Sequence, residues 1–407
     1  MKAQTILFRR RAALSLRFLI LTMIALLLSC KGEQPSPQPP STDAGQAASK
    51  QSLLDVKAIE RMVADPAALR KAVEEDRGTY AWQLFVYLNN PLTGTNQKYW
   101  ETNFRQTSTI YLPTGCEPAP WGETQPPPEV VEQAKSLPNW VDPIQVWHNL
   151  DTRIQVDGLV LLDTWKQDVR YQLLMNKAAF DYIIERSFYN VDGQEKAAQE
   201  GKPANFPETS FELKTSWIWI GTDADKFNQL KPSYYIAPAY YEVVQNGKHI
   251  RWEVGYAALS GMHIINRSRP NWVWITFENV NNANFTAAKL EIPIPDYAKQ
   301  ANQAYQKALR DAGSIFANYQ LDGVQLDFQD PTLLANSNIE SAFQSQSSCI
   351  TCHALASIKP NGAYFNIVNS QGGNIGYYTG TPPDMAGYTP LDFVWSMKRA
   401  SRKTNCP

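Results

Sequence analysis

The feature that most constrains this chain is a pentapeptide near its C-terminal end, Cys349-Ile350-Thr351-Cys352-His353. Residues three positions apart lie about one turn apart on a helix, so both thiols would face the same side. The histidine follows directly and brings an imidazole beside them. Because the chain holds only five Cys and four His in 407 residues, chance is a poor explanation for this grouping. The pentapeptide therefore predicts a site where two sulfur atoms and one imidazole meet a single ligand.

A C-x-x-C-H run is typical of covalent attachment of haem c. Cys349 and Cys352 would form the thioethers, and His353 would bind the iron as its proximal ligand. A zinc site would need further ligands at similar spacing, and a thioredoxin-like dithiol would accompany a βαβ pattern, which the sequence does not indicate. The remaining candidates for metal ligands are scattered singly: Cys116, Cys406, His148, His249 and His263. We therefore expect one covalently bound haem c.

Residues 1–29 have the composition of a signal peptide. Five basic residues surround or precede an apolar run, Phe18 to Leu28, that is too short to span a bilayer as a mature helix. The run ends in Leu27-Leu28-Ser29-Cys30, which resembles a bacterial lipoprotein processing site, and that resemblance implies that Cys30 carries lipid. Lys31 resembles the residue that follows the cysteine in outer-membrane lipoproteins. An ordinary signal peptide with an incidental cysteine stays open as the alternative.

The two ends of the chain predict the same compartment, because lipoprotein processing and haem c attachment both occur outside the bacterial inner membrane. We expect a cell-envelope protein that is lipid-anchored at the outer membrane and faces the periplasm. The formal net charge is −1, and residues 1–29 contribute five positive charges, so the remainder carries −6. Nucleic acid as a partner would call for a basic surplus, which is absent from this composition. The expected membrane contact is through lipid alone.

The rest of the chain divides by composition. Residues 30–50 are rich in Pro, Ser, Gln and Ala, which predicts a tether. Residues 51–295 contain alternating apolar runs such as 169–175 and 211–220, which predict a large, mostly β domain with short helices. Within it, Asn246-Gly247 predicts a tight hairpin. Residues 296–324 read as a connecting helix and linker, and 325–407 as a small all-α haem domain. The predicted fold class is α+β.

The haem domain has a family resemblance. Ser337-Asn338-Ile339-Glu340 is a capping-box pattern, and Thr389-Pro390-Leu391-Asp392 is typical of a second helix start. A helix before C-x-x-C-H and another at the C-terminus resemble a minimal class I cytochrome c. The segments 81–89, 261–264 and 272–278 are similar to an uncharacterised group of bacterial proteins with a C-terminal haem c motif, and this resemblance implies no activity.

The sixth ligand of the iron decides between electron transfer and small-molecule chemistry. Met385 is the preferred candidate, because class I cytochromes c similarly supply a methionine from the loop before the last helix. His263 is an alternative within an apolar run, where a lone histidine is more often a hydrogen-bonded core residue. Met397 is less favoured, since packing is its expected task. His148 and His249 lie in polar, turn-like contexts and are expected to be solvated.

Other residues add weaker expectations. Cys116 and Cys406 could pair in an oxidising compartment, and two separate thiols are as good an interpretation. Four basic residues in the last segment suit either a helix C-terminus or a docking patch for an acidic redox partner: Lys398, Arg399, Arg402 and Lys403.

The sequence leads to three competing hypotheses for the function. The leading hypothesis is single-haem electron transfer in the envelope, with a redox protein or a small electron donor or acceptor as partner. The second is a haem-dependent oxidoreductase, oxidase-like or peroxidase-like, whose β domain binds the substrate. The third is a binding or sensor lipoprotein in which the haem is structural.

Overall fold

The structure is a computed structural model that describes residues 53–91, 96–142, 144–151, 160–366 and 385–406. The predicted signal peptide, Cys30 and the tether at 30–50 lie outside these residues. The described residues belong to one compact unit that spans 46–407. Among them, no helix has both the length and the apolar character needed to cross a bilayer.

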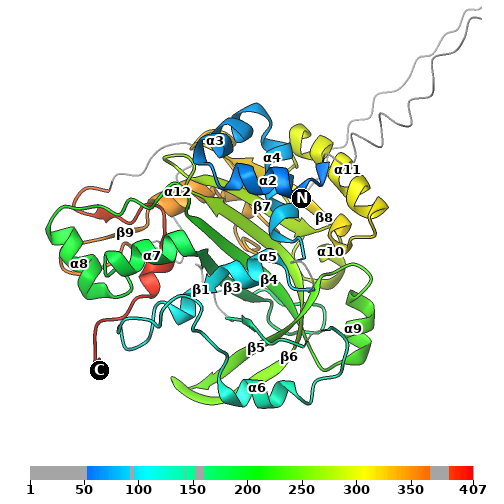
Figure 1. Ribbon diagram of the computed structural model, residues 1–407, viewed down its shortest axis with the longest axis horizontal. Coiled ribbons are helices and arrows are strands. Elements are labelled where there is room, and N and C mark those ends of the chain that lie inside the picture. The colour runs from blue at the N-terminus through cyan, green and yellow to red at the C-terminus, as the bar shows by residue number, and fades with distance from the viewer. Residues whose placement is uncertain (1–52, 92–95, 143, 152–159, 367–384, 407) are drawn as a thin grey trace, which may run out of the picture. The chain divides into compact units, whose positions relative to one another are not determined.

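An eight-stranded sheet forms the centre of the fold (Figure 1). Its strands are β1 (Phe104–Gln106), β2 (His148–Asn149), β3 (Arg170–Asn176), β4 (Phe211–Gly221), β5 (Ile236–Gln245), β6 (Lys248–Asn266), β7 (Val273–Asn279) and β8 (Tyr319–Gln325). The long strand β6 pairs with β4 on one edge, and on its other edge with β5 and then β7. β3 joins β4 to β1, and β8 extends the sheet beyond β7. All these pairs are antiparallel, whereas β2 runs parallel to β5.

Eleven α-helices surround the sheet within the described residues. They are α2 (Val56–Val63), α3 (Pro66–Glu75), α4 (Arg77–Leu88), α5 (Tyr99–Asn103), α6 (Pro128–Ala134), α7 (Lys177–Glu185), α8 (Val191–Gln199), α9 (Ala224–Leu230), α10 (Asn282–Phe285), α11 (Asp296–Asp311) and α12 (Cys349–Ala354). The first three helices follow one another closely. Each begins after an aspartate, Asp55, Asp65 or Asp76, whose side chain caps the helix by accepting a hydrogen bond from a backbone N–H.

The sheet buries both faces, since successive residues of a strand point to opposite sides. Ile264 and Ile275 face a core that α2, α3, α4 and α11 cover. There, Trp82 of α4 contacts Phe277 of β7. Ile265 and Trp274 face a second core. It contains residues of α7 and α8 and of the C-terminal segment, by which we mean the described residues between 326 and 406, including α12. Figure 1 shows this segment beside α7 and α8.

Several local predictions are confirmed. β5 and β6 form the expected hairpin, and Asn246 and Gly247 at its turn have φ values of 52° and 73°. The Asn176 side chain accepts a hydrogen bond from the Ala179 amide at the start of α7. The helix expected after Pro295 is α11, followed by the 3-10 turn η2 (Ile315–Asn318).

The predicted α+β class, with a separate all-α haem domain, is wrong. The fold is mixed α and β, and the C-terminal segment shares the second core with α7, α8 and the sheet. Between 325 and 406 the described residues contain one α-helix, α12, the two-residue strands β9 (Ser357–Ile358) and β10 (Thr389–Pro390), and the 3-10 turns η3 (Gln344–Gln346) and η4 (Trp395–Arg399). The resemblance to a helical class I cytochrome c therefore does not extend to the fold.

The two failed helices have physical causes. After the apparent capping box, Ser337 donates its backbone N–H to Glu278 of β7 instead of beginning a helix. Near the C-terminus, Asp392 and Phe393 have φ values of 51° and 68°, which an α-helix does not allow. Tertiary partners on the sheet therefore replace the local hydrogen bonds that each sequence pattern suggested.

Candidate functional site

The C-x-x-C-H residues open onto a cavity of about 360 Å³ between α12 and the sheet. The cavity is lined from the sheet by Leu173, Glu212, Lys214, His263, Ile265 and Trp274. The C-terminal segment provides the opposing lining, including Glu340, Cys349, Cys352, His353, Trp395 and Arg399. Its volume is in the range of small-molecule and cofactor sites. The structure thus gathers groups from four strands and the C-terminal segment around the predicted attachment site.

α12 is a short helix that carries the whole pentapeptide. Ser348 caps it by accepting a hydrogen bond from the Thr351 backbone N–H at 3.3 Å. Gln325, the last residue of β8, accepts from the Ile350 backbone N–H at 3.0 Å and donates to Ser348 Oγ at 3.0 Å. The end of a strand therefore fixes where the helix begins.

The two cysteines of the pentapeptide are both free thiols, and both line the cavity. Burial raises the pKa of the Cys352 thiol to about 12 and raises that of Cys349 well above its ordinary value. Both sulfurs are therefore protonated near neutral pH and are not paired with each other.

His353 is oriented by the backbone of the C-terminal segment. Its Nδ1 lies 2.7 Å from the Phe393 carbonyl oxygen. A carbonyl only accepts, so Nδ1 carries the proton and Nε2 keeps its lone pair. Burial lowers the pKa of His353 to about 3, and the neighbouring Lys214 and His263 act in the same direction. The imidazole is thus neutral, as a metal ligand must be.

His263 also lines this cavity, from strand β6. Its side chain is buried, and its Nε2 has no hydrogen-bond partner among the described residues. The closest acidic group is Glu340, whose Oε2 lies 3.4 Å from Nε2. Lys214 of β4 is the direct cross-strand neighbour of His263 and lines the same space.

Neither predicted methionine ligand is brought to the cavity. Met385 is half-buried at the end of a segment whose preceding residues, 367–384, lie outside the description, and it is absent from the described lining. Met397 is fully buried in the second core and is likewise absent from that lining. Packing is therefore the observed task of Met397. Of the three proposed distal ligands, the structure places only His263 with the C-x-x-C-H residues.

Sequence reasoning missed three charged residues of the cavity, Glu212, Lys214 and Glu340. Glu340 is placed by Asn336, whose side-chain amide donates to Thr276 Oγ1 and to the Phe277 carbonyl oxygen. Asn336 approaches β6 at Gly261, where a Cβ atom would lie 3.0 Å from its amide atoms. No sequence signal could have found these contacts, because residues far apart in the chain make them.

Cys116 and Cys406 are joined by a disulfide, which the sequence left open. Two of the four basic residues of the last segment form ion pairs within the molecule. Arg399 lies 2.8 Å from Asp151, and Arg402 contacts both Asp192 and Glu195. These ion pairs tie the segment to its surroundings and weaken the idea of a free docking patch.

The expectation that His148 is solvated is wrong. His148 is only 2% exposed, and its ring bonds to Glu101 and to Gln172 on opposite sides. Glu101 also accepts a hydrogen bond from Tyr235 and one from the Lys98 backbone N–H. His249, by contrast, is exposed and lies beside Glu242, as expected. Glu101, the partner of His148, also lines a second cavity.

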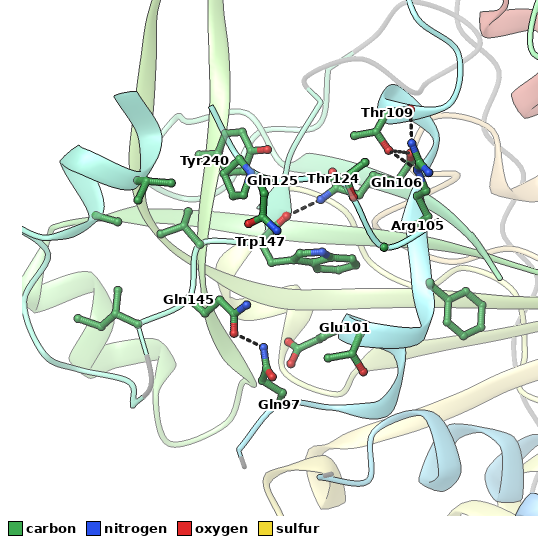
Figure 2. Close-up of a pocket in the computed structure, with 18 of the residues that line it drawn as sticks. Gln97, Glu101, Arg105, Gln106, Thr109, Thr124, Gln125, Gln145, Trp147 and Tyr240 are labelled. Carbon is green, nitrogen blue, oxygen red and sulfur yellow. Dashed lines mark hydrogen bonds between the residues drawn. The ribbon is translucent and has the colours of Figure 1, made fainter. Parts of the chain in front are cut away.

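This second cavity has a volume of about 600 Å³ and lies by β1 and the start of α6. Figure 2 shows the Trp147 ring within it, between Gln125 and Gln145. Its three charged side chains are already engaged. Arg105 donates to Thr109 and to the Ala119 and Pro120 carbonyl oxygens. Glu101 contacts His148 and Tyr235, and Lys135 pairs with Glu132. No hydrogen bond among the described residues engages the side chains of Thr124, Gln125 and Tyr240. The groups left available are therefore neutral, which suits a neutral polar ligand.

Clusters of three or more His, Cys, Asp or Glu side chains arranged to hold a metal ion are not found among the described residues. Comparisons with models of protein families, with curated proteins and with solved structures found no match to this chain.

Proposed function

We propose that this chain binds one haem c through Cys349, Cys352 and His353 and transfers single electrons in the bacterial cell envelope. The observation that carries the proposal is the meeting of the two free thiols and a neutral imidazole at one cavity. The haem would supply a one-electron Fe(III)/Fe(II) couple. The lipid anchor at Cys30 and the outer-membrane location rest on the sequence of the N-terminal segment.

The residues present fit such a group. The Phe393 carbonyl holds the Nδ1 proton of His353, which is the support that metal-bound histidines need to keep Nε2 free. Lys214 lines the cavity and would suit a negative propionate group of a haem. Trp274 packs against the His353 ring, with centroids 4.3 Å apart, and limits its rotation.

Absorption and mass spectrometry test the proposal on protein made in bacteria with an intact haem c ligation apparatus. We expect one covalent haem per chain and complete loss of it in the Cys349→Ala/Cys352→Ala variant. The Cys116→Ser/Cys406→Ser variant is the matched control, since it removes two cysteines remote in sequence from the pentapeptide and is expected to keep its haem. Unmodified thiols in the wild-type protein would contradict the proposal. Loss of lipid in Cys30→Ser separately tests the anchor.

The second cavity favours an alternative function, a haem-dependent oxidoreductase whose neutral polar substrate binds beside Trp147. In that case each substrate molecule, oxidised from an alcohol to a carbonyl, would give one electron to the ferric haem of each of two chains and release its two protons to water. A panel of neutral sugars and polyols can be screened by the change in the visible spectrum on reduction. Reduction that is lost in Gln125→Ala but kept in Gln133→Ala, an exposed glutamine outside the cavity, would establish this alternative. An unreduced haem throughout leaves electron relay as the function.

A further inference from the structure

We propose that His263 of strand β6 is the second axial ligand of the haem iron, so that two imidazoles hold the iron. The inference rests on the proposed haem at Cys349, Cys352 and His353, and it defines the coordination of that site. It replaces Met385, which the described lining of the cavity does not include.

The first support is the state of the His263 side chain. Only 6% of the residue is exposed, and its Nε2 has no hydrogen-bond partner among the described residues. A buried polar atom without a partner destabilises a fold because it has lost its hydrogen bonds to water, and such atoms in folded proteins call for an explanation. A bond from this ring to iron in the adjoining cavity supplies one.

The second support is the register of the sheet. Ile265 pairs with Trp274, and His263 pairs with Thr276, so His263 is the diagonal neighbour of Trp274 on the same face. The His353 ring in turn packs on Trp274. The two histidines therefore stand over the same patch of the sheet, one carried by a strand and the other by α12.

The third support is the carboxylate beside His263. Metal-bound histidines usually donate their other ring N–H to a carboxylate or carbonyl group. Glu340 Oε2 lies 3.4 Å from Nε2, and Glu340 is held by the Asn336 backbone N–H at 2.8 Å. The two ring nitrogens point in different directions, so the nitrogen that does not bind the iron can donate to Glu340. His353 has the equivalent support from the Phe393 carbonyl.

Lys214 is the competing ligand. Its Cα pairs with that of His263 on the adjacent strand, and its side chain reaches the same cavity. Unlike His263, Lys214 keeps part of its side chain exposed, and the strand does not fix its flexible four-carbon chain over the cavity. The Lys214→Ala variant separates the two candidates.

Two strong-field axial ligands leave no vacant position on the iron. The consequence is a low-spin centre that exchanges electrons and does not bind peroxide, oxygen or carbon monoxide. Coordination by His263 therefore favours the relay function over the oxidoreductase alternative, and it makes the sheet part of the redox site.

Electron paramagnetic resonance and visible spectra of the purified haem protein test this ligand. We expect the wild type to show low-spin bis-imidazole signals with no methionine-to-iron band. His263→Ala should become high-spin and bind carbon monoxide, whereas His263→Met should restore a low-spin state and gain the methionine-to-iron band. His249→Ala changes an exposed histidine outside the cavity and should leave the spectrum as in the wild type.

Several outcomes would overturn the inference: a methionine band or a high-spin signal in the wild type, an unchanged spectrum in His263→Ala, or a loss of low-spin character in Lys214→Ala alone. If His263→Ala does not fold, the wild-type and His263→Met spectra still decide. Failure of the proposed function is separate, because a wild-type protein without covalent haem fails the mass measurement before any coordination is assessed.

Discussion

The cavity at Cys349, Cys352 and His353 has two walls, the sheet wall formed by the strands and the C-terminal wall formed by the C-terminal segment. Different interactions hold the two walls in place. The sheet wall consists of neighbouring strands whose backbone ladders fix each side chain in register, as Lys214, His263 and Thr276 show. The C-terminal wall contains one six-residue α-helix and a series of turns. It is held by contacts with distant residues, such as Gln325 to Ser348 and Arg267 to Asp392 at 3.0 Å.

The difference separates two tasks. The C-terminal wall carries the residues that would be covalently modified, and a segment built of short turns can open locally at lower cost than a long strand ladder. The sheet wall contributes the opposing histidine and the packing surface, for which fixed positions matter more. We therefore expect substitutions in the sheet wall to lower global stability, and substitutions in the C-terminal wall to act more locally.

Trp274→Ala gives the largest expected effect on this comparison. Trp274 is 2% exposed in the second core and supports the His353 ring. Its truncation should lower the free energy of unfolding by about 3–5 kcal/mol, measured by chemical denaturation. Trp395→Ala is the matched control in the C-terminal wall, where a half-buried indole donates to the Cys352 carbonyl oxygen, and its expected cost is about 1–2 kcal/mol. Equal losses would show that the two walls do not differ.

The disulfide is the next largest effect. Cys116 and Cys406 are 290 residues apart in sequence, so the crosslink restricts the unfolded chain strongly. The Cys116→Ser/Cys406→Ser variant should unfold with a free energy lower by about 2–5 kcal/mol. Native-state hydrogen exchange should show, in 385–406, a loss of protection larger than the fall in the global free energy of unfolding that β4 and β6 report. A loss in 385–406 no larger than this global fall would contradict the idea that the C-terminal wall acts locally.

Glu278 joins the two walls and makes stability depend on pH. Burial raises its pKa from 4.5 to about 7, although hydrogen bonds from Ser337 oppose the shift. The native state therefore keeps this proton in a range where the unfolded chain releases it, so stability falls as pH rises from about 4.5 to 7. The loss approaches about 3 kcal/mol above that range.

Glu278→Gln tests this dependence, because glutamine keeps an oxygen acceptor for the Ser337 N–H but does not titrate. Chemical denaturation at pH values from about 4 to about 8 covers the range in which Glu278 titrates in the unfolded and folded states. Over this range the free energy of unfolding should change less with pH in the variant than in the wild type. Identical profiles would mean that Glu278 is not the group responsible.

Ser348→Ala should have the smallest effect. Removal of this cap from α12 is expected to cost about 1 kcal/mol in the free energy of unfolding. Ser348→Thr keeps the hydroxyl and should recover most of that cost. A loss of free energy of unfolding as large as that expected for Trp274→Ala would show that the C-terminal wall contributes as much to global stability as the sheet wall does.

Local patterns in the sequence predicted part of this fold well. The turn at Asn246-Gly247 and the strands predicted from the alternating runs at 169–175 and 211–220 depend on residues within a few positions of one another. The helix patterns at 337–340 and 389–392 failed because the same residues found better partners on β7 and in the second core. A propensity of a few tenths of a kcal/mol per residue does not withstand such competition.

The sequence by itself placed two thiols and an imidazole within five residues near the C-terminus, and that spacing predicted a shared site for them. It also named His263, but it could not place that residue beside His353. Only the tertiary structure decided this, since β6 and α12 lie more than 80 residues apart in the chain and meet through strand register and core packing. Contacts of that kind arise from the folding of the whole chain and leave no periodic signal in any single stretch of it.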